Sequence, residues 1–260
     1  MAISTKITTS LVPTITQSLL FAAIKAAMTN AGFASTYDDY TSGTDLIVVY
    51  ELVVDGSKTF GKVYLRIRLT TALVVAQQIF TAWNTTAKTG TNGSTEATYT
   101  ALGAATTITF TAFNSTEFRL VVLTQGTALI PLGLVVPENK QPFWDLNSWA
   151  YGFFFTTASM AVLRGVISTN NPYANSDFDV SLVGNSRLTN INSQTGQPDL
   201  IKGLILLSQS NQGVGASFSE DIGIGAFSTQ TRFTDAIPPG TSQIYAIIQN
   251  LAGGIAIRYT

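Results

Sequence analysis

The sequence predicts an α+β fold that passes into an all-β region, and two patterns indicate this. One long apolar stripe at helical spacing lies near the start of the chain, within residues 14–31. Short runs of β-branched and aromatic residues, separated by turn-forming residues, fill most of the rest. We therefore expect an N-terminal helix packed on an antiparallel hairpin or sheet, followed by a β-sandwich-like or partly closed barrel C-terminal half.

The predicted helix spans residues 14–31, between Pro13 and Gly32. Proline is favoured in the first turn of a helix and glycine just after its last turn. Lys25 interrupts the apolar run, which is too short for a membrane span, so we expect a buried amphipathic helix rather than a targeting segment or membrane insertion. Its apolar stripe comprises Ile15, Leu19, Leu20, Ala23, Ile24, Ala27 and Met28.

A hairpin is predicted next, from residues 46–54 and 62–70 with a turn at Asp55-Gly56-Ser57. The second strand alternates, with Val63, Leu65, Ile67 and Leu69 on one face. Tyr64, Arg66 and Arg68 share the other face, which we interpret as a solvated or interface-facing strand surface.

Residues 72–88 have Leu73, Ala76, Phe80 and Trp83 at helical spacing, which predicts a second helix. The β-branched pair Val74-Val75 counts against it. Residues 88–94 read as a flexible loop.

After this loop the pattern is almost wholly that of strands. The proline-bounded residues 137–142 suggest a division into an α+β docking domain, residues 1–136, and a β-rich sandwich-like domain, residues 137–260, although the two halves could form one fused domain. The predicted strands are residues 106–112, 118–124, 128–136, 161–167, 178–183, 200–207, 222–227, 243–248 and 255–259.

The composition excludes several kinds of chemistry. The 260 residues include neither Cys nor His, so thiolate and imidazole catalysis and disulfides are ruled out. Carboxylate-only hydrolysis stays open, but no acid pair is selected by its spacing. Asp177 and Asp179 share a strand face without further acids nearby, so we expect no metal and no cofactor.

The charge content points to a surface that is buried against neighbours. Only 11% of residues are charged and the net charge is −1, whereas soluble domains have about 25% charged residues. Lys and Arg are scattered, so we expect no nucleic-acid partner. Such a composition favours an assembling protein over an isolated monomer.

Residues 143–155 are unusually dense in aromatic side chains. They have three possible roles: core packing, a protein interface, or a platform that stacks on sugar rings. Because neighbouring strand residues alternate in direction, three successive Phe residues must place at least one outward. The candidate residues for an interface or sugar platform are Trp144, Trp149, Tyr151, Phe153, Phe154 and Phe155.

The chain as a whole is weakly charged, rich in Thr, Ser and Asn, free of Cys and His, and β-rich in its second half. In this composition and organisation it resembles virion structural proteins of tailed bacteriophages, most of all tail, baseplate or fibre components. Three segments contribute to the likeness. They are the helix at residues 14–31, the hairpin sequence DGSKTFGKVYLRIRLT at residues 55–70, and QPFWDLNSWAYGFFF at residues 141–155. The resemblance implies a non-enzymatic protein that is assembled in the host cytoplasm into a symmetric or ring-like part of the virion. Its partners would be copies of itself and other virion proteins.

Other functions compatible with the sequence are a receptor-binding or carbohydrate-binding protein, with a host surface glycan as its partner, and a capsid decoration protein. A carboxylate-only polysaccharide hydrolase is the remotest alternative.

Overall fold

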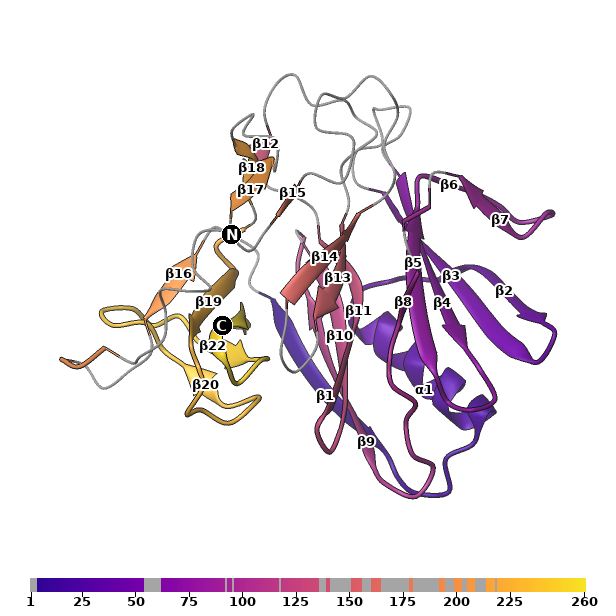
Figure 1. Cartoon of the computed structure of the whole chain (residues 1–260), viewed down its shortest axis with the longest axis horizontal. Coiled ribbons are helices and arrows are strands. Elements are labelled where there is room, and N and C mark those ends of the chain that lie inside the picture. Colours follow the sequence, from indigo (N-terminus) through magenta and orange to yellow (C-terminus); the bar gives the residue numbers. More distant parts are fainter. Residues whose placement is uncertain are drawn as a thin grey trace.

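We describe the fold from a computed structural model of the chain. It covers residues 4–53, 62–91, 93–94, 96–116, 118–135, 139–140, 151–155, 160–164, 178–179, 192–194, 199–202, 205–208, 214–217 and 219–260. Within these residues there are one helix and several antiparallel sheets, which confirms the predicted β-rich fold with an N-terminal helix (Figure 1). Each of these sheets has two ends, so none of them closes on itself and the expected partly closed barrel is not formed.

The helix α1 (Gln17–Asn30) confirms the helix predicted for residues 14–31 but begins later. The reason is local: Thr14 has a φ of 72°, and the Thr16 hydroxyl accepts a hydrogen bond from the Leu19 amide at 3.3 Å, which caps the helix. Gly32 ends it at a φ of +92°, and a Cβ there would lie 2.4 Å from Oδ1 of Asn114.

The predicted apolar stripe of the helix is wrong at one position. Leu19 is 50% exposed, whereas Phe21, which was not in the stripe, is buried. The other large members, Leu20, Ile24 and Met28, are fully buried. The buried face of the helix is therefore rotated toward Phe21 and away from Leu19, relative to the stripe that the sequence predicts.

One five-stranded sheet follows the helix, in the order β2-β3-β4-β5-β8. The antiparallel pairing of β3 with β4 confirms the predicted hairpin, although its turn lies outside the described residues. The strands are β2 (Thr36–Ser42), β3 (Asp45–Val53), β4 (Lys62–Leu69), β5 (Val75–Phe80) and β8 (Ala97–Thr98).

The predicted second helix at residues 72–88 is wrong. Its place is taken by β5 and by a small hairpin of β6 (Ala82–Asn84) and β7 (Thr89–Thr91), the latter within the predicted loop. Leu73 adopts a φ of 57°, which no right-handed helix can contain. From Val75 onward β5 pairs with β4 and buries Val75 and Ile79, so tertiary packing overrides the helical spacing.

A six-stranded sheet has the order β1-β9-β10-β11-β13-β14. It confirms the predicted strands at residues 106–112, 118–124 and 128–136, and the turn at Gly126 joins the last two. Its strands are β1 (Thr5–Leu11), β9 (Ile108–Asn114), β10 (Phe118–Gln125), β11 (Ala128–Val135), β13 (Tyr151–Phe155) and β14 (Met160–Arg164).

This sheet contains strands from both sides of the predicted boundary at residues 136 and 137. Leu134 and Val135 of β11 pair with Gly152 and Tyr151 of β13. Within residues 137–142 the structure describes only β12 (Asn139–Lys140). The division into two domains therefore stays a prediction.

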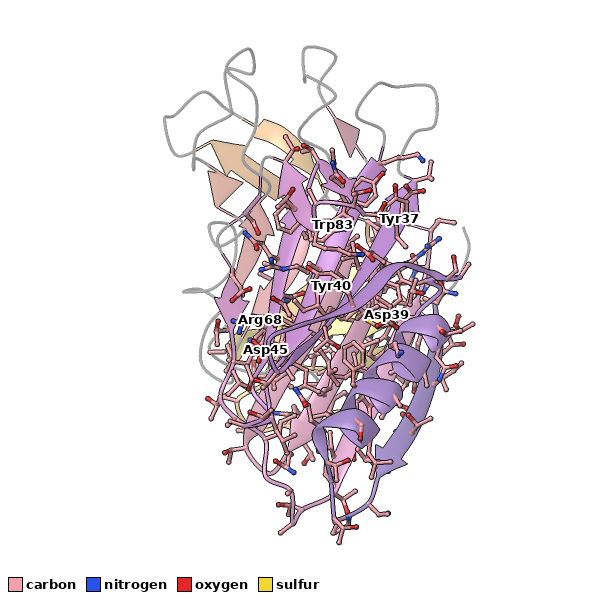
Figure 2. The ribbon with its side chains drawn as sticks, turned by 90° about the vertical axis from the view of Figure 1, so that its right-hand side faces the viewer. Tyr37, Asp39, Tyr40, Asp45, Arg68 and Trp83 are labelled. Carbon is pink, nitrogen blue, oxygen red and sulfur yellow. The ribbon has the colours of Figure 1, made fainter. Side chains whose placement is uncertain are left out.

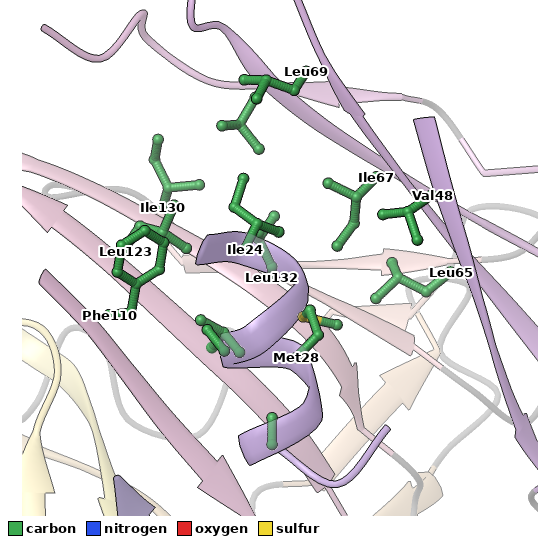
Figure 3. Packing of buried hydrophobic residues seen from close by; sticks show 14 of the residues in the cluster. Ile24, Met28, Val48, Leu65, Ile67, Leu69, Phe110, Leu123, Ile130 and Leu132 are labelled. Carbon is green, nitrogen blue, oxygen red and sulfur yellow. The ribbon is translucent and has the colours of Figure 1, made fainter. Parts of the chain in front are cut away.

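The main core lies between these two sheets, with α1 inserted between them. Ile24 and Met28 of α1 contribute to it from the helix. Figure 3 shows them among side chains of both sheets, which include Val48, Leu65, Ile67, Leu69, Phe110, Leu123, Ile130 and Leu132. The expectation that the helix packs on a sheet is thus confirmed.

A buried amide also joins the two sheets through this core. Nε2 of Gln77, on β5, donates to the carbonyl oxygen of Pro131 on β11 at 2.8 Å, and its Oε1 accepts from the Gly133 amide at 3.3 Å. The Tyr99 hydroxyl donates to the same Pro131 oxygen at 2.9 Å. The bonds therefore satisfy backbone groups of Pro131 and Gly133 on β11. The pairing of β11 with β13 begins just after them, at Leu134.

The C-terminal strands form two further sheets, with the orders β16-β19-β22-β21-β20 and β12-β18-β17-β15. The strand predicted at residues 200–207 is in fact two strands, β16 and β17, in different sheets. The strands not yet bounded are β15 (Phe178–Asp179), β16 (Leu200–Lys202), β17 (Ile205–Ser208), β18 (Val214–Ser217), β19 (Ile222–Ala226), β20 (Asp235–Ala236), β21 (Tyr245–Ile247) and β22 (Ala252–Arg258).

The five-stranded C-terminal sheet lies on the other side of the six-stranded sheet from α1 (Figure 1). Two contacts join them: the Lys6 ammonium lies 4.4 Å from the centre of the Tyr259 ring, and Arg232 donates to the Thr127 carbonyl at 3.3 Å. Phe113 and Leu120, which lie opposite each other in the six-stranded sheet, are fully buried but are not part of the main core. The six-stranded sheet is thus the middle of three layers.

Candidate interaction surface

The structure places only part of the predicted aromatic site. Trp144 and Trp149 lie outside the described residues. Tyr151, Phe153, Phe154 and Phe155 belong to β13, whose backbone pairs with β14 along its whole length and with β11 at one end. Their side chains are outside what the structure describes, so the role of this segment as core, interface or sugar platform stays a prediction.

A second surface can be built from residues upward. It is the face of the β2–β5 sheet that points away from α1, here called the outer face, and Figure 2 shows it. Cross-strand pairing aligns Asp38, Val49, Arg66 and Gln78 across four strands. Because directly paired residues point to the same side of a sheet, all four belong to this face.

An aromatic cluster occupies one part of the outer face. Val49, Tyr64, Phe80 and Trp83 are buried together, and Phe80 and Trp83 meet edge to face with ring centres 5.3 Å apart. The β6–β7 hairpin lies directly on this cluster, since a Cβ on Gly90 would be 2.0 Å from Cδ1 of Phe80. The hairpin thus covers apolar surface that the sheet alone would expose.

Beside the cluster is a network of charged side chains from three strands and a loop. Glu96 accepts from Arg66 and from Arg68, each at 2.5 Å, and Arg68 also donates to Asp45 at 3.0 Å. Arg66 makes a further bond to Gln78 at 2.8 Å and stacks over Phe80 with its guanidinium carbon 5.5 Å from the ring centre. Burial raises the pKa of Glu96, but the hydrogen bond and charge of Arg68 and the charge of Arg66 outweigh this and hold the pKa below its ordinary value.

Asp38, on β2, lies on the outer face on the other side from Glu96 and makes its own set of polar contacts. Its carboxylate accepts from Nε1 of Trp83 at 2.9 Å and from Lys88 at 2.7 Å. Burial raises the pKa of this carboxyl, and the hydrogen bonds from Lys88 and Trp83 lower it further than burial raises it. The Lys88 ammonium also lies 4.8 Å from the Tyr40 ring centre.

The sequence predicted a solvated or interface-facing surface here. Tyr64 is buried, with 7% exposed, whereas the two arginines are held in ion pairs and keep 21% and 27% of their side chains exposed. Whether this face is an interface stays a prediction. Because residues 72–88 were predicted to form a helix, Gln78 and Phe80 were not expected beside Arg66 and Tyr64. Alternation at Ala76, Gln78 and Phe80 was the signal that would have placed them on one strand face.

The arrangement constrains the chemistry of the outer face. Each of its carboxylates, Asp38, Asp45, Glu51 and Glu96, contacts a Lys or Arg side chain. The face therefore presents positive and negative charges that neutralise one another. Across the residues that the structure covers, no group of three or more acidic side chains is arranged to hold a metal ion.

The only helix among the described residues, α1, is too short to cross a membrane. Comparisons of the chain with models of known protein families and with curated proteins find no match.

Proposed function

We propose that this protein is a structural component of a bacteriophage virion, which assembles through protein–protein contacts in the tail, baseplate or fibre complex. In this proposal it carries no cofactor and catalyses no reaction. The sequence supports the proposal through its lack of His and Cys, its low charge content, and its resemblance to virion proteins.

The observation that carries the proposal is the neutralised outer face. The aromatic cluster of this face is already covered by the β6–β7 hairpin, and its charges are already paired and partly buried. Covering paired, partly buried charges with another protein removes less solvation energy than covering isolated, fully hydrated charges. A catalytic carboxylate, by contrast, needs a pKa tuned toward the working pH, and Asp38 and Glu96 have theirs shifted the opposite way.

The same proposal includes a sandwich arrangement for the C-terminal half. Phe227, Tyr245 and Ile247 of this half are fully buried in a cluster of their own. A separate apolar cluster beneath an antiparallel sheet supports packing of that sheet against a second layer.

Size-exclusion chromatography with light scattering on the purified chain tests the proposal. We expect a defined oligomer, since subunits of this class form symmetric assemblies. A protein that stays monomeric at every concentration would contradict assembly by self-contact.

The alternative of glycan recognition rests on the aromatic density of residues 143–155. It is tested on a glycan array with Trp149→Ala. Binding by the unsubstituted chain that is lost in this variant would favour a receptor-binding protein, whereas a chain that binds no glycan would count against it.

A further inference from the structure

The first strand of the chain has an unusual position. β1 lies at one end of the six-stranded sheet and pairs with β9 alone, over seven consecutive residues from Thr5 to Leu11. Its outer edge has no strand partner among the described residues. In an antiparallel pair, alternate residues turn their amide and carbonyl groups away from the neighbour, so within the part of the chain that the structure describes this edge presents a row of backbone groups without a strand partner.

β1 also has few of the sequence features that normally protect a free edge. Its register with β9 has no bulge, it contains no proline, and Lys6 is its only charged residue. The edge strand β2 of the neighbouring sheet also contains no proline, but its register is irregular and it carries two charged residues, Asp38 and Asp39. Long, regular and weakly charged edges are the ones that pair with another strand.

Exposed apolar side chains gather at the same place. Within the described residues, Ile7, Val12 and Leu19 are three of the six large apolar side chains that are exposed, at 41%, 68% and 50%. Leu19 lies on the outward side of α1 with Ala22 and Ala26, and α1 packs against β1. Exposed apolar side chains therefore lie on β1, directly after it, and on the helix that packs against it.

We propose that β1 pairs antiparallel with β1 of a second copy of this chain, so that two six-stranded sheets join into one across a two-fold axis. This deepens the proposed function, on which it rests, by naming the surface through which copies assemble. A strand edge requires an extended strand as its partner, and β1 itself satisfies this requirement.

The sequence of β1 favours this antiparallel self-pairing over the parallel one. With Thr8 opposite Thr8 of the second copy, Lys6 lies opposite Ser10, and the two ammonium groups are four residues apart, roughly 13 Å along the strand. That separation exceeds the Debye length of about 8 Å at physiological salt. Parallel pairing in register would instead place the two Lys6 side chains directly opposite each other, which is unfavourable.

The same symmetry brings the helices together. A two-fold axis between antiparallel strands runs perpendicular to the sheet, so both copies of α1 lie on the same face of the joined sheet. Leu19, Ala22 and Ala26 would then face the axis from both sides and add apolar area to a contact that backbone pairing alone would leave narrow.

Cross-linking tests the pairing directly, because the natural chain has no cysteine. We expect Thr8→Cys to form a disulfide-linked dimer on mild oxidation, reversed by reductant. Thr86→Cys, at a threonine that is also exposed and lies in the turn of the β6–β7 hairpin, is the matched control and should give no more dimer than random collision. Circular dichroism on both variants checks that they are folded.

A second pair of variants measures affinity by equilibrium sedimentation. Ile7→Lys adds charge at the edge, and we expect the dissociation constant of the dimer to rise at least tenfold. Ile237→Lys, at a residue exposed to a similar extent (46%) outside the edge, should leave the constant unchanged.

The outcomes separate this inference from the proposed function. An oligomer in which Thr8→Cys cross-links no better than Thr86→Cys, and Ile7→Lys associates normally, would overturn β1 pairing but leave assembly standing. A disulfide between the Cys introduced at position 8 and a protein other than a second copy of this chain would also overturn self-pairing. A monomer at all concentrations would contradict self-assembly as such.

Discussion

The side-chain amide of Gln77 on β5 lies 2.8 Å from the carbonyl oxygen of Pro131 on β11 and donates a hydrogen bond to it across the main core. Gln77 is 1% exposed, so both ends of its amide need partners inside the protein. It finds them on β11, where Pro131 has no amide proton to give and Gly133 supplies one. One polar side chain thus links the β2–β5 sheet to the six-stranded sheet.

We expect Gln77→Leu to lower the free energy of unfolding by about 1–3 kcal/mol, because it leaves the Gly133 amide without this acceptor inside the core. Urea denaturation followed by circular dichroism measures the change. Tyr99→Phe removes only a hydroxyl from the same group and should cost less, about 0.5–1.5 kcal/mol. Equal stability of Gln77→Leu and the natural chain would show that the amide is dispensable.

Two glycines of the β10–β11 hairpin should respond very differently to alanine. Gly126 has a φ of +56° with nothing near its absent Cβ, so Gly126→Ala should cost about 1–2 kcal/mol of backbone strain. Gly133 has a φ of +153°, and a Cβ there would lie 2.0 Å from the Arg119 carbonyl oxygen. We expect Gly133→Ala to add about 1–3 kcal/mol of overpacking to its strain. Thermal unfolding of both variants tests the order, which would be contradicted by a more stable Gly133→Ala.

The ion pair between Asp221 and Arg258 is the most buried of those described, with 2% and 13% of the side chains exposed and 3.3 Å between Oδ1 and Nη1. We expect Asp221→Ala to destabilise the protein by about 3–5 kcal/mol, since it leaves a buried guanidinium without this partner. Asp45→Ala is the comparison, because Arg68 keeps Glu96 there and the loss should be at most about 1 kcal/mol. Similar losses in urea titrations of the two variants would contradict this account.

We expect acid to lower the free energy of unfolding, and we expect pH changes near neutrality to leave it unchanged. The chain has no His or Cys, so few groups titrate between about pH 6 and 7.5 and the free energy of unfolding should be flat there. The folded state holds the pKa of Glu96 below its ordinary value of 4.5, so its stabilisation is complete above pH 4.5 and is lost as the pH falls through the folded pKa.

Glu96→Gln checks this assignment. The variant should be less stable than the natural chain at pH 7, and the two unfolding curves should converge as the solution becomes acid. Parallel curves from pH 7 to pH 3 would show that Glu96 contributes nothing to acid sensitivity.

Local sequence patterns predicted correctly those helices and strands whose formation depends mainly on residues within the element itself. The helix near Leu20 has a stripe and a terminating glycine, and the β3–β4 hairpin has a turn signal and an alternating second strand, so both predictions are correct in kind. The helix predicted for residues 72–88 was wrong, because the spacing of Phe80 and Trp83 fits a helix as well as it fits a strand followed by a hairpin. Only pairing with β4, a contact between distant residues, decides between them.

The outer face could not have been assembled from the sequence for the same reason. Glu96 is far along the chain from Arg66 and Arg68, and only the sheet register brings the three side chains together. The free edge of β1 is likewise a property of strand order. The composition indicated only a low charge content. That the charges of the outer face are paired with one another is known from the structure alone.

Quantitative mass spectrometry of purified phage particles from cells that produce this chain tests the central claim most directly. We predict that the chain co-purifies with the particles in a constant ratio to the other virion proteins, in several copies per particle, and withstands high-salt washing. A chain that is absent from the particles and found only in the remaining lysate would contradict a structural role in the virion.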